Sequence, residues 1–322
     1  MAVVLIHSLG EFDYSTGYNS AFIILRQIIN FAVATFVFMA GYFVNVDALS
    51  DKVQLQTLDN LSGGGRLCIP FMIWSLLYSG LELLRNVHSG NEIHCFGFVY
   101  RFIVGKSATP FYYIVVLVQL TVITPWLIKI VKQNGIISRI LWLVTPVYLV
   151  YLYTWNYIVG ASPRLYETLF PAWFGFYYLG IQVRCGWKLK GNGFVVAATL
   201  LLSCVEAIGL RATGLDIGFY TSQITAGSFL YSFAMIGWLL KKNESNCSIC
   251  RLLSKIGDCS YGIFYIHMAV LMIVGRIIQS ENWYIYWILR FMLTTSISYI
   301  IVHIGQMVLK SHKKLLRYIG FI

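Results

Sequence analysis

The stretch FYYIVVLVQLTVITPWLIKIV, residues 111–131, decides the fold class of this chain. It is apolar almost throughout, and Lys129 is its one charged residue. A helix needs about 20 apolar residues to cross the hydrocarbon core of a bilayer. Strands of a membrane barrel alternate apolar and polar residues instead. This stretch is therefore typical of a transmembrane helix.

Similar apolar stretches occur along the whole chain. They cover residues 21–44, 69–84, 136–155, 166–183, 194–210, 217–240, 252–275 and 283–309, and a shorter fragment covers 1–9. No linker, low-complexity tract or repeat of fixed period interrupts them. The sequence predicts an all-α, polytopic membrane helix bundle of about ten spans, formed by a single integral domain over residues 1–322.

Composition agrees with a membrane protein and excludes a nucleic-acid partner. The chain has 322 residues, of which 58% are hydrophobic and 11% charged, whereas a soluble domain has about 25% charged residues. The net charge is +11, but the basic residues lie in short loops between apolar stretches. Most of the 24 lysines and arginines fall on one side, which predicts a cytoplasmic location for that side and for both termini. The bilayer is the expected environment, and a bacterial inner membrane the expected location.

The N-terminal fragment MAVVLIHSL contains a histidine at position 7. Ionisable residues at membrane depth are costly and usually line a cavity or a reaction path, so His7 is the first functional candidate. The six residues before it cover roughly 9 Å of a core about 30 Å thick. We expect about ten residues of helix to be missing upstream. A half-helix or a surface anchor is the alternative.

Four segments, in this order, resemble acyltransferase family 3, the integral-membrane O-acyltransferases that acylate envelope sugars. They are VVLIHS (3–8), FAVATFVFMAGYF (31–43), RLCIPFMIW (66–74) and SYGIFYIH (260–267). The first resembles the end of the family's first span, the second its second span, the third its basic start of span three, and the fourth its penultimate span. The resemblance implies a ten-span fold.

The chain also departs from the family pattern. Family members carry an arginine about one helical stretch before the histidine, where this sequence has no residue. Of the family's Arg-x-x-Arg pair only Arg66 is present, because Gly63 occupies the first position. Ala34 and Ala40 replace a proline and a serine that are common in span two. These departures leave a non-catalytic relative as one alternative function.

The resemblance implies transfer of an acetyl or other acyl group from a cytoplasmic acyl-coenzyme A donor to a hydroxyl of a cell-surface or exported carbohydrate. Acetyl-coenzyme A would be a co-substrate, and no bound cofactor is expected. Such a transfer needs a base, donors for an oxyanion and cations for the carrier's phosphates. Imidazole suits the first task because its pKa of about 6.5 is close to working pH. His7 would be the base, with Glu11 or Asp13 as its orienting group. A structural histidine at a helix end is the alternative.

The donor-binding candidates precede the third apolar stretch. The Arg66 guanidinium can bind phosphate in a bidentate manner, although it also satisfies the positive-inside rule without any ligand. Gly63, Gly64 and Gly65 predict a flexible loop whose backbone amides could approach a phosphate. No Lys-Ser/Thr follows them, so this is not a nucleotide-binding P-loop.

Further polar residues within the apolar stretches are candidates for the substrate cavity. Tyr261, Tyr265 and His267 are expected on roughly one side of a span, and a packing role for His267 is equally compatible with the sequence. Arg26 and Tyr42 complete the set. Glu206, inside another span, needs an internal partner.

No metal site is expected. The seven cysteines are scattered, and the one close pair, Cys247 and Cys250, has no second pair at zinc spacing. The alternative from another class is a secondary transporter or glycan exporter, which would show broken helices in matching halves. The sequence shows no inverted repeat.

Overall fold

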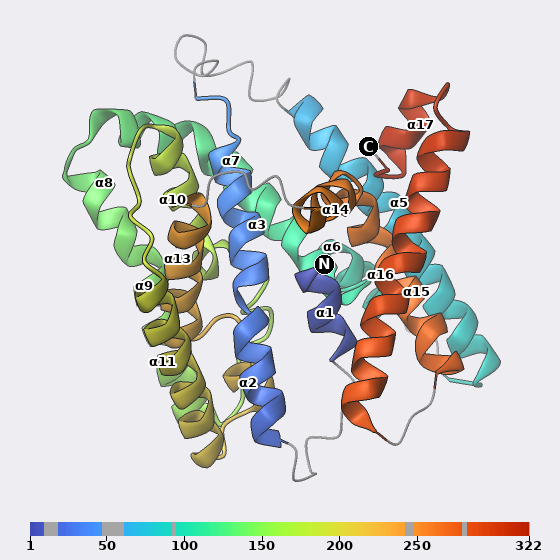
Figure 1. Cartoon of the computed structure of the whole chain (residues 1–322), viewed down its shortest axis with the longest axis horizontal. Helices are drawn as coiled ribbons and strands as arrows, with labels where there is room; N and C mark the ends of the chain where they lie inside the picture. Colours follow the sequence, from blue (N-terminus) through green and yellow to red (C-terminus); the bar gives the residue numbers. More distant parts are fainter. Residues whose placement is uncertain (10–18, 47–60, 92–94, 242–247, 279–281, 322) are drawn as a thin grey trace. The chain divides into compact units, whose positions relative to one another are not determined.

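The computed structural model describes residues 1–9, 19–46, 61–91, 95–241, 248–278 and 282–321, and all the regular elements in these ranges are helices (Figure 1). The chain divides into two compact units. The terminal unit comprises Met1–Phe12, Leu58–Val115 and Ser245–Ile322, and the central unit comprises Asp13–Thr57 and Val116–Glu244. The expected single domain over 1–322 stays a prediction.

The terminal unit is built on two long antiparallel helices. Its elements are α1 (Ala2–Ser8), α5 (Leu61–His88), α6 (Cys95–Ile103), η1 (Thr109–Phe111), the first residues of α7 (Tyr112–Gln133), α14 (Ser248–Asp258), α15 (Ser260–Ile277), α16 (Trp283–Val308) and α17 (Lys313–Tyr318). Helix α15 packs along α16, and the short α1 contacts both, as Figure 1 shows. A segment from the start of the sequence therefore meets two consecutive helices that lie more than 250 residues later.

Two apolar clusters hold the terminal unit together. In the first, Val4 of α1 packs with Ile263, Val302 and Phe321. In the second, Tyr78, Phe111 and Tyr265 are buried against one another. The Tyr78 hydroxyl donates to the Tyr265 carbonyl at 2.8 Å and accepts from the Ala269 amide at 3.0 Å. It thereby bridges two backbone groups of α15 that are one helical turn apart, and fixes α15 against α5.

The central unit contains the remaining helices. They are α2 (Asn19–Ile29), α3 (Phe31–Tyr42), the rest of α7, α8 (Ile136–Ile140), η2 (Leu141–Leu143), α9 (Val144–Val159), η3 (Phe170–Ala172), α10 (Phe174–Arg184), α11 (Gly193–Ala212), α12 (Ile217–Tyr220) and α13 (Ala226–Lys241). Helices α3 and α10 touch backbone to backbone. A side chain at Gly180 would meet the Phe38 carbonyl oxygen and come within 2.6 Å of the Tyr42 nitrogen. Glycine permits this approach, as is common between membrane helices.

Buried polar groups of the central unit form a connected cluster, the Gln27 cluster, made of Gln27, Asn30, Ser203 and Ser228. The Gln27 side-chain oxygen accepts from Ser203 at 2.7 Å, from Ser228 at 2.8 Å and from the Asn30 amide at 3.1 Å. All four residues are fully buried. Such mutual pairing is how polar groups are accommodated away from water.

The structure supplies the partner that Glu206 requires. Its carboxylate accepts from the Tyr153 hydroxyl and, at 2.7 Å, from the Gly227 amide. Glu206 therefore joins α9, α11 and the start of α13 inside the central unit. Its contacts are those of a structural clamp.

Within the described residues, seven helical segments are long and apolar enough to cross a membrane: Ala21–Tyr42, Leu67–His88, Thr109–Gln133, Ile136–Val159, Gly193–Ala212, Ser260–Ile277 and Trp283–Val308. The all-α class fits these segments, but the count of about ten is not confirmed. Three of the predicted stretches contain helices that are shorter than the 18 residues required of a span: α1 has 7 residues, α10 has 11 and α13 has 16.

Hydrogen bonds explain why the stretch 217–240 is broken into α12 and α13. The Thr221 hydroxyl bonds back to the Ile217 carbonyl at 2.7 Å, and the Ser222 hydroxyl accepts from the Ile224 amide at 3.1 Å. The Asn30 side chain also donates to the Ser222 carbonyl at 3.0 Å. Side chains of this kind compete with helical backbone bonding, so the helix stops and restarts.

One local prediction is wrong. Gly63, Gly64 and Gly65 were expected in a flexible loop, whereas α5 begins at Leu61 and includes them. The reason is that a helix that continues into a long apolar stretch extends with one hydrogen bond per added residue. The penalty of about 1 kcal/mol per glycine does not stop it.

Candidate functional site

The interior of the terminal unit brings together two histidines from opposite ends of the sequence. His7 near the end of α1 and His267 in α15 lie with their ring centres 5.4 Å apart and their planes tilted by 39°. His7 is half-buried, and His267 is fully buried. The two apolar neighbours of α1 that anchor it, Val4 and Ile6, are buried as well. The structure thus places His7 beside a second imidazole.

His267 has a defined tautomer. Its Nδ1 lies 2.9 Å from the Ile263 carbonyl oxygen, and because a carbonyl only accepts, the neutral ring carries its proton on Nδ1. The Nε2 atom is then a bare acceptor. It is buried and has no hydrogen-bond partner among the described residues.

The expectation that Tyr265 and His267 share one side of the helix is wrong. The Tyr265 ring lies against Trp74, with centres 6.3 Å apart, and against Phe111 at 5.7 Å. His267 instead faces α1. Residues two positions apart in an α-helix point in directions about 200° apart around the helix axis, so Tyr265 and His267 face different neighbours. Tyr261 stays with Tyr265, and their hydroxyls are 3.0 Å apart.

Helix α16 adds a buried polar face that the sequence analysis did not single out. We call Arg290, Thr294 and Ser298, which are spaced by four residues, the α16 polar face; all three are fully buried. The Arg290 guanidinium lies 5.0 Å from the Tyr286 ring centre. Its Nη2 atom is 3.2 Å from where a β-carbon would stand at Gly275 of α15. The face is therefore turned toward the interior of the terminal unit.

A signal for this face was present in the sequence. Arg290 is a charged residue inside the apolar stretch 283–309, and such residues mark functional sites in membrane proteins. The spacing of Arg290, Thr294 and Ser298 is that of one helical face. No sequence pattern, by contrast, pairs His7 with His267.

The other predicted site residues lie elsewhere. Arg26 and Tyr42 belong to the central unit, where the Arg26 Nε donates to the Thr221 carbonyl at 3.3 Å. Tyr42 lies against the Phe38 ring at 5.9 Å. Glu11 and Asp13 lie outside the described residues, and Arg66 is described only as part of the α5 backbone. In the described ranges no group of three or more histidine, cysteine or acidic side chains is placed to hold a metal ion.

A comparison with protein families shows the family of this chain. The model of the family described as an acyltransferase domain, acyltransferase family 3, matches residues 1–303 of the 322 in the chain. The chain belongs to acyltransferase family 3. Neither a curated protein nor a solved structure matches it. The protein is therefore a membrane acyltransferase.

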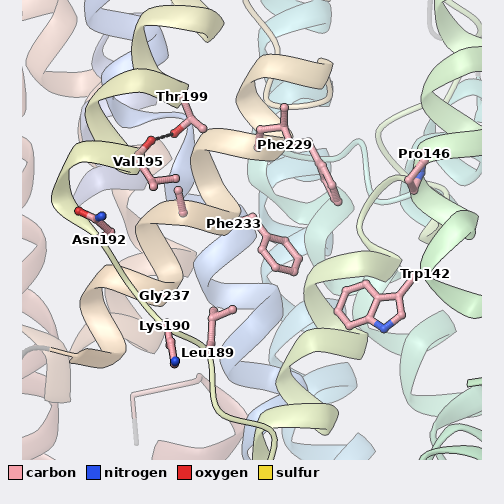
Figure 2. A pocket seen from close by; sticks show the side chains of 12 residues that line it. Trp142, Pro146, Leu189, Lys190, Asn192, Val195, Thr199, Phe229, Phe233 and Gly237 are labelled. Carbon is pink, nitrogen blue, oxygen red and sulfur yellow. Dashed lines mark hydrogen bonds between the residues drawn. The ribbon is translucent and has the colours of Figure 1, made fainter. Parts of the chain in front are cut away.

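The family 3 acyltransferase also has a groove in its central unit. The groove has a volume of about 390 Å³. Its lining residues include Trp142 and Pro146 on one side, Phe229 and Phe233 of α13, and residues of α11 and of the segment before α11. Figure 2 shows the aromatic rings of α13 between α11 and Trp142. Lys190 is its one charged lining residue. None of the predicted site residues lines this groove.

Proposed function

We propose that this acyltransferase transfers an acetyl group, or a related acyl group, from an acyl-coenzyme A donor to a hydroxyl of a cell-surface or exported carbohydrate. The observation that carries the proposal is the contact between the His7 and His267 rings inside the terminal unit. The family supplies the reaction class. An imidazole held within a membrane protein against a second imidazole fits the base that such a transfer requires.

The chemistry places His7 at the acceptor. The acceptor oxygen attacks the thioester carbonyl carbon and forms the new C–O bond, while its proton passes to His7. The carbonyl electron pair moves onto oxygen and then returns as the C–S bond breaks. The thiolate leaves and recovers the proton from the His7 imidazolium. The atoms balance without any oxidant or metal.

His267 acts as a positioning residue for His7. Its Nε2 is a bare, buried acceptor, and its ring lies beside the His7 ring; a neutral His7 that donated one N–H to this atom would keep its other nitrogen free as the base. A base oriented by a third group is the arrangement of hydrolytic triads. Glu11 or Asp13, which follow α1, are alternative orienting groups.

The donor side of the proposal rests on Arg66. Its guanidinium would bind the phosphates of coenzyme A at the cytoplasmic end of α5, with Gly63, Gly64 and Gly65 beside it. Both termini would then be cytoplasmic and the protein would reside in a bacterial inner membrane. Tyr261 and Tyr265 remain proposed substrate-lining residues of the terminal unit, and Arg26 and Tyr42 remain candidates within the central unit.

The test measures the O-acyl content of envelope glycans by mass spectrometry in a strain that lacks this chain. We expect wild-type protein to restore acylation and His7→Ala to lower the transfer rate by about 10²-fold to 10⁴-fold, the usual worth of a general base. The matched control is His303→Ala, because His303 is an exposed histidine of α16. Both variants are compared at equal amounts in the membrane.

Two outcomes would contradict the proposal. Acylation that is the same with and without the chain favours a transporter or a non-catalytic relative. Full acylation with His7→Ala would support the acyltransferase activity but contradict the assignment of His7 as the general base.

A further inference from the structure

We propose that the α16 polar face is the oxyanion site of this enzyme: Arg290, Thr294 and Ser298 stabilise the acyl carbonyl oxygen as it becomes negative. The inference rests on the proposed function and deepens it, because it assigns the group that faces the base across the reacting carbonyl. It involves residues that neither the family resemblance nor the sequence motifs single out.

The first observation is that the hydroxyls of this face lack partners. The Thr294 and Ser298 oxygens are buried and make no hydrogen bond to any described residue. Serine and threonine in a helix usually bond back to the carbonyl four residues earlier, as Thr124 and Thr199 do in this protein. A buried polar group without a partner costs about 1–3 kcal/mol. Other buried hydroxyls, Thr295 among them, also lack partners, but Thr294 and Ser298 lie one turn apart on the same face as the buried Arg290, so a ligand that accepts hydrogen bonds could complete both.

The second observation is that Thr294 and Ser298 of α16 lie at the same height along the helix pair as His267 of α15. Gly262 packs against Val302, and Gly275 packs against Arg290. In this antiparallel register His267 lies opposite the turn of α16 between Thr294 and Ser298. The two unpartnered hydroxyls and the unpartnered Nε2 of His267 therefore occupy the same layer of the terminal unit.

The third observation is the contact of α1 with the same helix. The Trp287 indole N–H, one turn before Arg290, lies 3.5 Å from the Leu5 carbonyl oxygen. Leu5 precedes His7 by two residues. Helix α1 is thus held against both α15 and α16, so the base and the polar face belong to one interior.

The charge of Arg290 decides what the site binds. A guanidinium only donates hydrogen bonds and stays protonated, and Arg290 is fully buried in a span that is otherwise nearly free of charge. Donors and a fixed cation away from water stabilise a developing negative charge far more than they would in water. In acyl transfer that charge develops on the carbonyl oxygen. The carbonyl π electrons move onto it when the acceptor oxygen attacks, and they return when the thiolate leaves.

The experiment uses membranes of the deletion strain that carry each full-length variant. Acetyl-coenzyme A with a labelled acetyl group is supplied, and the initial rate of label transfer to glycan is measured against donor concentration. We expect Thr294→Val and Arg290→Gln each to lower kcat by about 10²-fold or more, the usual loss for one oxyanion donor, with KM for acetyl-coenzyme A unchanged. Thr294→Ser retains the hydroxyl and should restore most of kcat.

Matched controls separate this role from a structural one. Thr154→Val removes an exposed hydroxyl of α9 that bonds back to Val150, and Arg276→Gln removes an exposed charge at the end of α15. Both should transfer at the wild-type rate. Where Arg290→Gln fails to accumulate, the nearly isosteric Thr294→Val decides.

The outcomes distinguish this inference from the proposed function. Wild-type rates for Thr294→Val, or a raised KM with unchanged kcat, would overturn the oxyanion site while an inactive His7→Ala still supports the base. Absence of labelled glycan with the wild-type protein would overturn the proposed function and the oxyanion site together.

Discussion

The Gln27 cluster of the central unit and the α16 polar face of the terminal unit are both fully buried. They differ in how many of their side chains have hydrogen-bond partners. In the first, one side-chain oxygen accepts from two serines and an asparagine. In the second, two hydroxyls have no partner among the described residues. In the Gln27 cluster each residue makes at least one side-chain hydrogen bond, although the Asn30 side-chain oxygen has no partner among the described residues, and such bonding secures helices without needing a ligand. Under the proposal above, a substrate would complete the missing bonds of the α16 polar face, so the two clusters are expected to respond differently to substitution.

The largest effect is expected at the glycine contact of the scaffold. Gly180→Val should destabilise the central unit by about 3 kcal/mol or more, because its side chain would meet the backbone of α3. Thermal unfolding of the purified protein in detergent measures this. Gly209→Val is the matched control, since a β-carbon there has no heavy atom of another element within 4 Å. Equal unfolding temperatures for the two variants would show that α3 and α10 are not closely packed.

A smaller loss of stability is expected for Tyr78→Phe. This variant tests whether the loss of unfolding free energy depends on hydrogen bonding or on the unit in which the residue lies. The Tyr78 hydroxyl lies in the terminal unit but is fully paired with two backbone groups of α15. Its removal should lower the free energy of unfolding by about 2 kcal/mol. Tyr157→Phe, at a side chain that is 86% exposed, should leave unfolding unchanged. If Tyr78→Phe behaves like its control, hydrogen bonding cannot explain the contrast between the two clusters.

The smallest effects come from a matched pair that compares the clusters directly. Ser203→Ala should cost about 1 kcal/mol, because it removes a bond to Gln27. Ser298→Ala removes no bond and should leave the unfolding free energy nearly unchanged. Denaturant titration of both variants in the same detergent provides the measurement. A loss for Ser298→Ala as large as that for Ser203→Ala would mean that Ser298 has a structural partner.

Much of the helical architecture follows from apolar length alone. The stretch predicted at 136–155 corresponds to Ile136–Val159, and that at 283–309 corresponds to Trp283–Val308. Prediction was poorer where polar side chains bond to the backbone, as Thr221 and Ser222 do before α13. Hydropathy cannot predict such bonds, because it scores the polarity of each side chain separately and does not describe hydrogen bonds between residues.

The candidate site was predictable only in part. His7 was identifiable from its position inside an apolar fragment, and its role remains a prediction. Its neighbour His267 is separated from it by most of the chain, and only the packing of α1 on α15 brings the rings together. Arg290 could have been found from its charge alone, but its burial could not.

The terminal unit is assembled from segments at both ends of the sequence. During synthesis His7 leaves the ribosome early, whereas His267 and the whole of α16 follow after the entire central unit. Helix α1 therefore lacks its packing partners α15 and α16 until these two helices have been inserted. Arg290 adds a cost to that late step, because a charged side chain within a membrane span opposes insertion. If the proposed base and oxyanion site are correct, translation that stops before α16 is expected to leave membrane-inserted protein without activity.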